Sequence, residues 1–154
     1  MKQSNDDNTK GMFYVLFLLV VTLVLSGCGT QNAAVDNTPA SVVQEYFTSW
    51  TAKEYATMYT LVSDGFKKVE LTAASLESFK KELGKFFDQG DGITVIKAVT
   101  TQNDGRIAKV NYTIEMSLKT RKQQFSGTYT LRNTATGWKL IHPYGNNVDL
   151  SEEK

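Results

Sequence analysis

The residue with the most distinctive chemistry in this chain of 154 residues is Cys28, the single cysteine. It follows Leu25, Ser26 and Gly27, which close an apolar stretch that begins at Met12. A cysteine thiol can carry a thioether-linked lipid, and small residues before it suit a peptidase that must hold an extended backbone closely. The sequence thus offers a single thiol, placed directly after small residues at the end of an apolar stretch.

The Leu25-Ser26-Gly27-Cys28 sequence resembles a bacterial lipobox, the recognition sequence of lipoprotein precursors. The apolar stretch has fourteen residues, fewer than the roughly twenty of a membrane-spanning helix and typical of a signal peptide. The resemblance implies a signal peptide over residues 1–27, then a lipidated Cys28 and a flexible tether over residues 28–38. It also implies a position on the outer face of the cytoplasmic membrane of a Gram-positive bacterium. A diacylglyceryl group on Cys28 would supply the two acyl chains that stable membrane anchoring needs. The alternative is an uncleaved membrane anchor with an incidental cysteine.

Composition limits the function classes of the remaining chain. Without residues 1–27, two of the 17 basic and two of the 16 acidic residues are lost, and the near-neutral balance does not favour nucleic-acid binding. Once Cys28 is lipidated, no thiol remains for a disulfide, a metal site or catalysis. The glycine-flanked Asp88, Asp91 and Asp104 lack the ligand spacing of a calcium loop. We therefore expect one domain with neither metal nor cofactor.

Helical spacing of apolar residues dominates the first half of this domain. Thr38 is a suitable N-cap, and Pro39 suits the first helical position because its missing N–H would have no partner there. A Thr72 cap begins the last helix, and the glycine-rich segment 88–92 ends it. The apolar spacing predicts helices over residues 39–50, 53–62 and 72–87.

From Ile93 onward the apolar residues alternate with a period of two, which is typical of strands. Four consecutive antiparallel strands are predicted over residues 93–101, 110–119, 123–132 and 138–142. The Asp104-Gly105 pair tolerates the positive φ angles of a tight hairpin turn. Alternation on one face predicts that this face packs on the helices while the other meets water. The sequence thus predicts an α+β fold, three N-terminal helices on a four-stranded meander sheet, with a frayed tail over residues 146–154.

A family resemblance supports this architecture. Residues 42–63, with Val42-Val43-Gln44-Glu45-Tyr46-Phe47 and Trp50, and the strand Trp138-Lys139-Leu140-Ile141 resemble the nuclear-transport-factor-2-like, or cystatin-like, fold over about residues 39–143. More narrowly, they are similar to the non-catalytic N-terminal domain of methicillin-resistance-type penicillin-binding transpeptidases. The resemblance implies a domain over residues 39–145 whose curved sheet encloses a cone-shaped pocket, which some relatives use as an active site. The chain is too short for the transpeptidase domain itself, so penicillin-binding activity is not expected.

Enzymes with this fold place an acid, alone or with a histidine, on the inward sheet face, because proton abstraction needs a base within reach of the substrate. Strand parity directs inward only residues that are not bases at neutral pH: Val110, Tyr112, Ile114, Met116, Leu118, Phe125, Tyr129 and Leu131. Glu115 falls on the outer face unless a bulge shifts the register. His142, the single histidine, stands at the end of the last strand, where a solvated or capping role is expected. The sequence therefore predicts a protein that is not an enzyme.

Aromatic residues could still line a pocket in the cone. The expected lining residues are Tyr46, Trp50, Tyr59, Tyr112, Met116, Phe125 and Tyr129. Aromatic residues at such spacing usually build a core, with any hydroxyl at the rim, so a filled cone is the alternative.

The sequence favours a non-enzymatic lipoprotein that binds or scaffolds near the cell wall, attached to the membrane through Cys28. Its expected partner is a cell-wall synthesis protein or a small apolar ligand. Two other hypotheses use the cone: a small isomerase or hydrolase, and a carrier of a small apolar ligand. Pairing through the outer sheet face, as a homodimer, is left open.

Overall fold

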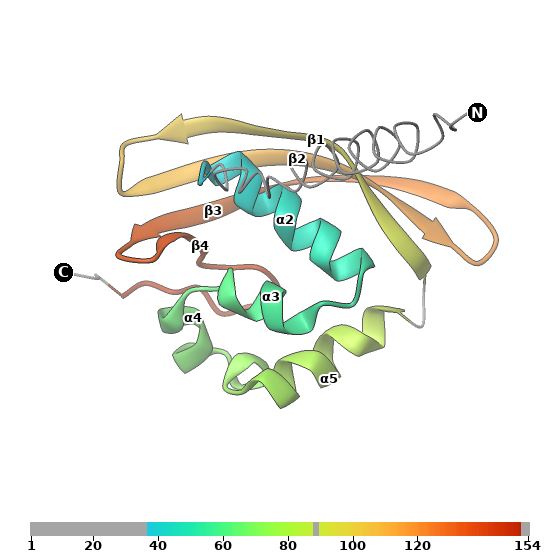
Figure 1. Ribbon diagram of the computed structural model, residues 1–154, viewed down its shortest axis with the longest axis horizontal. Helices are drawn as coiled ribbons and strands as arrows, with labels where there is room; N and C mark the ends of the chain where they lie inside the picture. Colours follow the sequence, from blue (N-terminus) through green and yellow to red (C-terminus); the bar gives the residue numbers. More distant parts are fainter. Residues whose placement is uncertain (1–36, 88–89, 152–154) are drawn as a thin grey trace, which may run out of the picture. The chain divides into compact units, whose positions relative to one another are not determined.

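The computed structural model describes residues 37–87 and 90–151, so the lipobox at residues 25–28 lies outside the described residues. The helices are α2 (Pro39–Thr51), α3 (Tyr55–Thr60), α4 (Asp64–Val69), the 3-10 helix η1 (Leu71–Ala73) and α5 (Leu76–Phe87). The strands are β1 (Gly90–Asn103), β2 (Ile107–Leu118), β3 (Lys122–Thr134) and β4 (Gly137–Leu140). They form one antiparallel sheet in the order β1-β2-β3-β4, with α2 crossing it (Figure 1). The predicted combination of helices with an antiparallel four-stranded meander is confirmed.

Helix α2 begins as predicted and is tied to the sheet at its other end. The Thr38 hydroxyl accepts a hydrogen bond from the Ser41 amide at 3.2 Å, and Pro39 occupies the first turn. At the C-terminal end, the Thr51 hydroxyl accepts from the Ile93 amide at 2.9 Å and donates to the Ile93 carbonyl at 2.7 Å. These two bonds satisfy backbone groups of Ile93 and fix α2 against the first strand.

The region between α2 and α5 differs from the sequence prediction. The helix expected over residues 53–62 is only the six-residue α3, and α4 was not predicted at all. Ser63, just past the end of the helix expected over residues 53–62, caps α4, because its hydroxyl accepts a hydrogen bond from the Phe66 amide at 3.1 Å. Burial of Phe66 stabilises this short helix. Helix α5 begins later than predicted, since the Ser75 hydroxyl accepts from the Ser78 amide while Thr72 lies in η1.

The sheet has one apolar and one polar face, and the register of β2 against β3 is unbroken. Val110 and Ile114 of β2 are buried on the face toward the helices. On the other face, hydrogen bonds join Thr128 to Asn111 at 2.8 Å and Thr113 to Ser126 at 3.0 Å. All the register shifts between β1 and β2 fall in β1, at Gly90/Gly92, Val95/Lys97 and Thr100/Gln102. Such irregularities bend a strand, and the beginning of β1 turns toward the C-terminal end of α5 (Figure 1).

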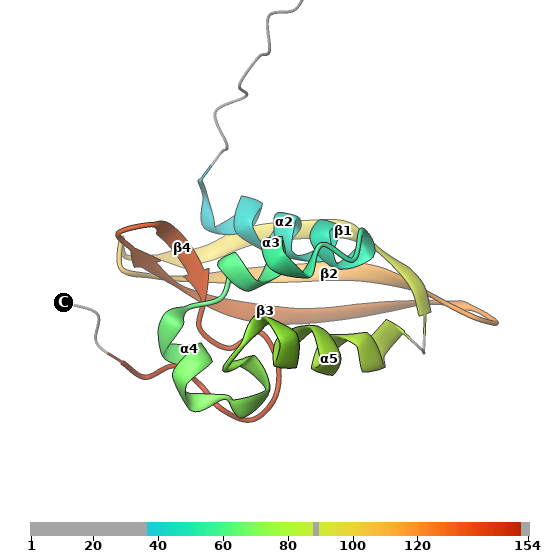
Figure 2. The same cartoon turned by 60° about the horizontal axis from the view of Figure 1, so that its bottom comes forward.

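The segment after β4 is held against α4 and η1, where the sequence predicted fraying from residue 146. The Asp149 side chain is 1% exposed and accepts hydrogen bonds from Ser63 and Arg132, each at 2.7 Å. A Cβ at Gly65 would overlap this carboxylate, so the close approach depends on glycine. The turned view shows the segment running beneath α4 (Figure 2). This segment has no apolar periodicity, because single polar hydrogen bonds hold it and not an apolar stripe.

Two carboxylates of this region make folding stability depend on pH. Hydrogen bonds from Thr72 and Asn147 outweigh desolvation and lower the pKa of Glu70. At Asp149, burial raises the pKa, but hydrogen bonds from Ser151, Ser63 and Arg132 outweigh it and lower the pKa overall. A lowered folded-state pKa adds stability that is complete above the unfolded value, about 4, and is lost as pH falls through the folded value.

We therefore expect the free energy of unfolding in urea to stay level from neutral pH down to about pH 5 and to fall as the pH drops further. Asp149→Asn, although less stable at neutral pH, should lose less on acidification than the wild type. Equal losses in both proteins would contradict this account of Asp149.

Candidate functional site

The rings of α2 and of the inward sheet face form one aromatic cluster, defined here as Tyr46, Phe47, Trp50, Tyr112 and Tyr129. The Tyr46 ring centroid lies 6.0 Å from those of both Trp50 and Tyr129, in edge-to-face arrangements. The ring centroids of Tyr112 and Tyr129, which come from adjacent strands, are 4.7 Å apart. Helix α2 supplies its members at helical spacing and the strands at a spacing that keeps them on one face. The cluster fills the centre of the space between α2 and the sheet.

The Tyr46 hydroxyl is the unusual atom of the aromatic cluster. The residue is fully buried, and its hydroxyl has no hydrogen-bond partner among the described residues. Burial, with Tyr144 and Tyr112 nearby, raises the pKa of Tyr46 far above its ordinary value, so the hydroxyl keeps its proton at any physiological pH. A buried hydroxyl without a partner costs free energy. In chemical terms it is an unused hydrogen-bond donor in an apolar setting.

The other hydroxyls of the aromatic cluster have partners. Tyr129 donates to the Pro143 carbonyl at 3.2 Å, and burial raises its pKa well above the ordinary value. Tyr112 lies over Gly127 of β3, where an added Cβ would come within 2.6 Å of the tyrosine hydroxyl. Burial also raises the pKa of Tyr112, although a hydrogen bond with Tyr129 acts in the opposite direction. All three tyrosines are therefore neutral donors and not bases.

One side of the aromatic cluster faces a partly exposed apolar rim. Trp50 is half-buried and meets Phe86 of α5 edge-on, with 6.0 Å between the ring centroids. Phe86 and Phe125 are 41% and 40% exposed, and Met116 is half-buried against the core. The Trp50 ring thus contacts both the buried Tyr46 ring and Phe86 of the rim, with 6.0 Å between ring centroids in each case.

The structure brings together only part of the predicted pocket lining. Tyr46, Trp50, Tyr112 and Tyr129 belong to the aromatic cluster, whereas Met116 and Phe125 lie at the rim. Phe125 pairs with Ile114 and so faces the predicted side, but no helix covers it, which explains its exposure. Tyr59 is a different case: its ring packs on Phe79 at 5.3 Å and its hydroxyl donates to the Ala73 carbonyl at 3.1 Å.

The acid and histidine considered from the sequence lie outside the aromatic cluster. Glu115 is on the outer face, where it forms an ion pair with Lys122 at 2.7 Å. Because the β2–β3 register has no shift, the alternative that turned Glu115 inward is wrong. His142 follows β4 and bonds to the Gly145 carbonyl through Nε2 at 2.9 Å. Asp104 accepts from the Arg106 and Ile107 amides in the hairpin turn.

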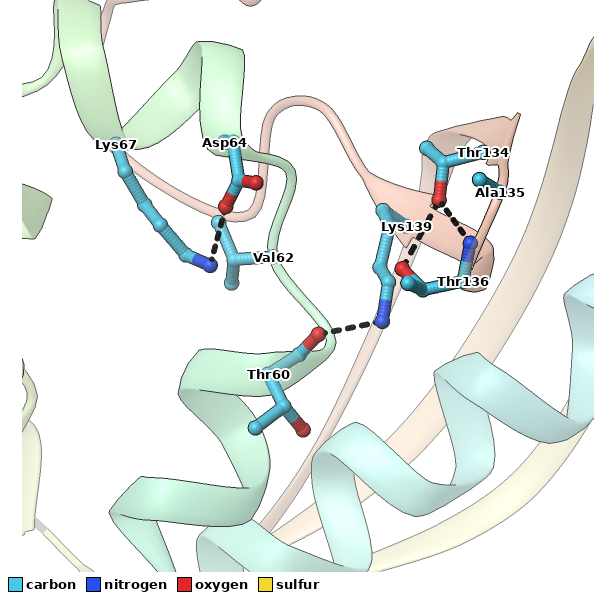
Figure 3. Close-up of a pocket in the computed structure, with 8 residues that line it drawn as sticks. All are labelled: Thr60, Val62, Asp64, Lys67, Thr134, Ala135, Thr136 and Lys139. Carbon is cyan, nitrogen blue, oxygen red and sulfur yellow. Dashed lines mark hydrogen bonds and ion pairs between the residues drawn. The ribbon is translucent and has the colours of Figure 1, made fainter.

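A separate polar pocket, which the sequence did not indicate, opens between α4 and the β3–β4 turn (Figure 3). Its volume is about 600 Å³, and its lining residues are Thr60, Val62, Asp64, Lys67, Thr134, Ala135, Thr136 and Lys139. Lysines and threonines in turns are so common that their spacing gave no signal. Within the parts of the chain that the structure describes, no three His, Cys, Asp or Glu side chains are grouped so that they could hold a metal ion.

The family of the chain follows from its sequence. Residues 40–145 match the family model of the SnoaL-like domain, so the chain belongs to the SnoaL-like domain family, within the nuclear-transport-factor-2-like superfamily. No curated protein matches the sequence.

Solved structures resemble the chain at low sequence identity. A SEC-C motif containing protein from Psychrobacter arcticus is 11% identical with a TM-score of 0.53, over 77% of this chain and 64% of that one. A candidate polyketide cyclase from Xanthomonas campestris pv. campestris is 14% identical with a TM-score of 0.46, over 64% and 82%. A ketosteroid isomerase-like protein from Erwinia carotovora atroseptica is 14% identical with a TM-score of 0.43, over 71% and 92%.

The family result corrects one expectation from the sequence. The prediction that the chain is not an enzyme is wrong. It treated the lack of an inward base as decisive. The SnoaL-like domain family, to which the chain belongs, points toward enzymatic family members. The neighbours' low identity shows the fold alone, so the reaction must be argued from this chain's own residues.

Proposed function

We propose that this chain binds a small, largely apolar molecule in the cone between α2 and the sheet, with the Tyr46 hydroxyl donating a hydrogen bond to an oxygen of that molecule. One observation carries the proposal: a fully buried hydroxyl without a partner in the centre of the aromatic cluster. An acceptor oxygen on an apolar ligand would remove the free-energy cost of burying that hydroxyl without a hydrogen-bond partner. The surrounding rings would contact the rest of the ligand. Because the aromatic cluster fills this space, Trp50 and Phe86 would have to move aside to admit the ligand to Tyr46.

A carbonyl compound fits this site best. A protonated tyrosine can polarise a carbonyl and stabilise the negative charge that develops on its oxygen when a proton leaves the neighbouring carbon. The raised pKa of Tyr46 suits this role, since the donor stays protonated throughout. The described inward residues of β2 and β3 supply no base, so in this proposal a water molecule that enters the cone with the ketone accepts the proton. Tyr46 stabilises the negative charge left on the ketone oxygen.

The experiment uses methyl naphthyl ketone and ethylnaphthalene, which resemble each other except for the oxygen. Tryptophan fluorescence, to which Trp50 and Trp138 both contribute, should report binding of both compounds to the full chain. Tyr46→Phe should weaken ketone binding about tenfold, the value of one hydrogen bond in a dry site, and leave the hydrocarbon unaffected. The same variant should unfold at equal or higher urea concentration, because it removes an unsatisfied buried group.

Exchange of the ketone methyl protons in heavy water then separates two forms of the function. Faster exchange with the wild type than with Tyr46→Phe would indicate isomerase-type chemistry, and binding without exchange would indicate a carrier. Two results would contradict the proposal: that neither compound changes the tryptophan fluorescence of the wild type, or that the wild type and Tyr46→Phe bind the ketone with equal affinity.

The lipid anchor belongs to the same proposal. It is supported by the Leu25-Ser26-Gly27-Cys28 sequence and would place the domain at the outer face of a Gram-positive cytoplasmic membrane. In residues 37–87 and 90–151, no helix is both long and apolar enough to cross a membrane. A cell-wall synthesis partner, the narrower transpeptidase-domain similarity and a homodimer remain predictions from the sequence.

A further inference from the structure

We infer that the polar pocket between α4 and the β3–β4 turn binds a small molecule that carries a carboxylate or phosphate group, held between the ammonium groups of Lys67 and Lys139. The pocket is distinct from the aromatic cluster, shares no residue with it, and is independent of the function proposed for the cone.

The two walls of the pocket are joined by backbone hydrogen bonds. Val62, which connects α3 to α4, forms a parallel bridge with Leu140 of β4. The Ser63 amide donates to the Leu140 carbonyl at 2.9 Å, and the Leu140 amide donates to the Leu61 carbonyl at 2.8 Å. Lys139 precedes Leu140, and Lys67 lies in the helix that Ser63 caps. The sequence separation of the two lysines is large, yet the sheet edge fixes their spacing, as a preformed site requires.

Lys139 has donor capacity to spare. Its ammonium donates to the Thr60 carbonyl at 2.7 Å, and no described carboxylate lies within ion-pair distance of it. An ammonium has three N–H donors, so two remain for a ligand. Figure 3 shows its side chain reaching from β4 toward the α3–α4 connection, with the Thr134 and Thr136 hydroxyls beside it.

Lys67 is the second cation. Its ammonium lies over the Tyr59 ring, 4.5 Å from the ring centroid, and its carboxylate partner is weakly held. It pairs with Asp64 at 2.9 Å, but the Asp64 side chain is 79% exposed while that of Lys67 is 18% exposed. Exposed pairs contribute little stability, so an anion in the pocket can replace Asp64. Figure 3 places this pair on the wall opposite Thr134 and Thr136.

The local charge also favours an anion. The positive charges of Lys67, Lys68 and Lys139 lower the pKa of Asp64. The carboxylates whose charge raises the pKa of Lys139 are those of Asp64 and Glu45. Burial, followed by repulsion from Lys67, lowers the pKa of Lys139 in spite of those carboxylates. An anion between the two ammonium groups would reverse this repulsion. The volume of about 600 Å³ lies in the range of small organic ligands and exceeds the need of a bare ion.

The test titrates phenyl phosphate, benzoate and uncharged benzyl alcohol into the ¹⁵N-labelled full chain and follows amide resonances by NMR. The two anions should shift the Thr134, Thr136 and Lys139 amides, and benzyl alcohol should not. Lys67→Gln or Lys139→Gln should weaken anion binding about tenfold or more, since each removes a charge-assisted hydrogen bond. Lys139→Arg should retain binding, and Lys85→Gln, which removes a charge of α5 that faces Glu82, should match the wild type.

Absence of shifts at these amides, equal affinity in Lys139→Gln, or equal weakening by Lys85→Gln would overturn the inference. A folded-state spectrum of each variant guards against loss by unfolding. Vesicles containing anionic phospholipid then distinguish the source of the anion. Displacement of phenyl phosphate would assign a lipid headgroup to the site, and no displacement would assign a soluble molecule.

Discussion

Replacing Arg132 with methionine should destabilise the fold by about 3–5 kcal/mol, because it leaves the buried Asp149 carboxylate without its cation. The Arg132 side chain is 12% exposed and that of Asp149 is 1% exposed, and the guanidinium also donates to the Asp149 carbonyl at 3.2 Å. The loss would be measured as the free energy of unfolding in urea, followed by tryptophan fluorescence. The effect should extend to the cone, since the segment held by Asp149 also presents the Pro143 carbonyl to Tyr129.

The matched control breaks an exposed ion pair on the same strand. Lys122→Met removes the partner of Glu115, but the Lys122 side chain is 70% exposed, so a loss within about 1 kcal/mol is expected. The double variant Arg132→Met/Asp149→Asn should recover part of the loss, as the unpaired charge is then gone. Similar losses in the Arg132 and Lys122 variants would show that the tail is not fixed by this pair.

Replacing Cys28 with serine should abolish lipid attachment and release the protein from the membrane, because a serine hydroxyl cannot form the thioether. A clickable palmitate analogue fed to a Gram-positive host should label the wild type and not Cys28→Ser. A control variant just past the motif, Thr30→Ser, should be labelled normally. An unlabelled wild type that stays with the membrane would instead favour the alternative of an uncleaved anchor.

The second half of the fold was predictable because its elements follow a simple period. β2 alternates without a break, and Val110 and Ile114 are buried as the parity required. The Asp104-Gly105 turn was equally predictable. Gly105 adopts a φ of 86°, and the Asp104 carboxylate accepts hydrogen bonds from two backbone amides.

The elements that were missed depend on single tertiary contacts. Helix α4 is six residues long, too short for its apolar pattern to be distinguished from a turn, and it depends on burial of Phe66 and on the Ser63 cap. The order of the C-terminal segment depends on single polar contacts with distant residues, such as the bonds of Asp149 with Arg132 and Ser63. None of these contacts leaves a periodic signal in the sequence.

The candidate site was predicted in part for the same reason. Periodicity identified Tyr46, Trp50, Tyr112 and Tyr129 as inward-facing, but it could not distinguish a hydroxyl with a partner from one without. That difference depends on whether an acceptor such as the Pro143 carbonyl lies opposite, as it does for Tyr129 and not for Tyr46. The pocket at Lys67 and Lys139 needed the backbone pairing of Val62 with Leu140, which no local pattern indicates.

The most direct measurement is the infrared carbonyl stretch of ¹³C-labelled methyl naphthyl ketone bound to the full chain. A hydrogen bond from Tyr46 weakens the C=O bond, so the band should move to lower frequency than in an apolar solvent. In Tyr46→Phe the band should return to its apolar-solvent position at the same degree of saturation. A bound ketone whose band is the same in both proteins would contradict the assignment of the Tyr46 hydroxyl as the donor of a small-molecule site.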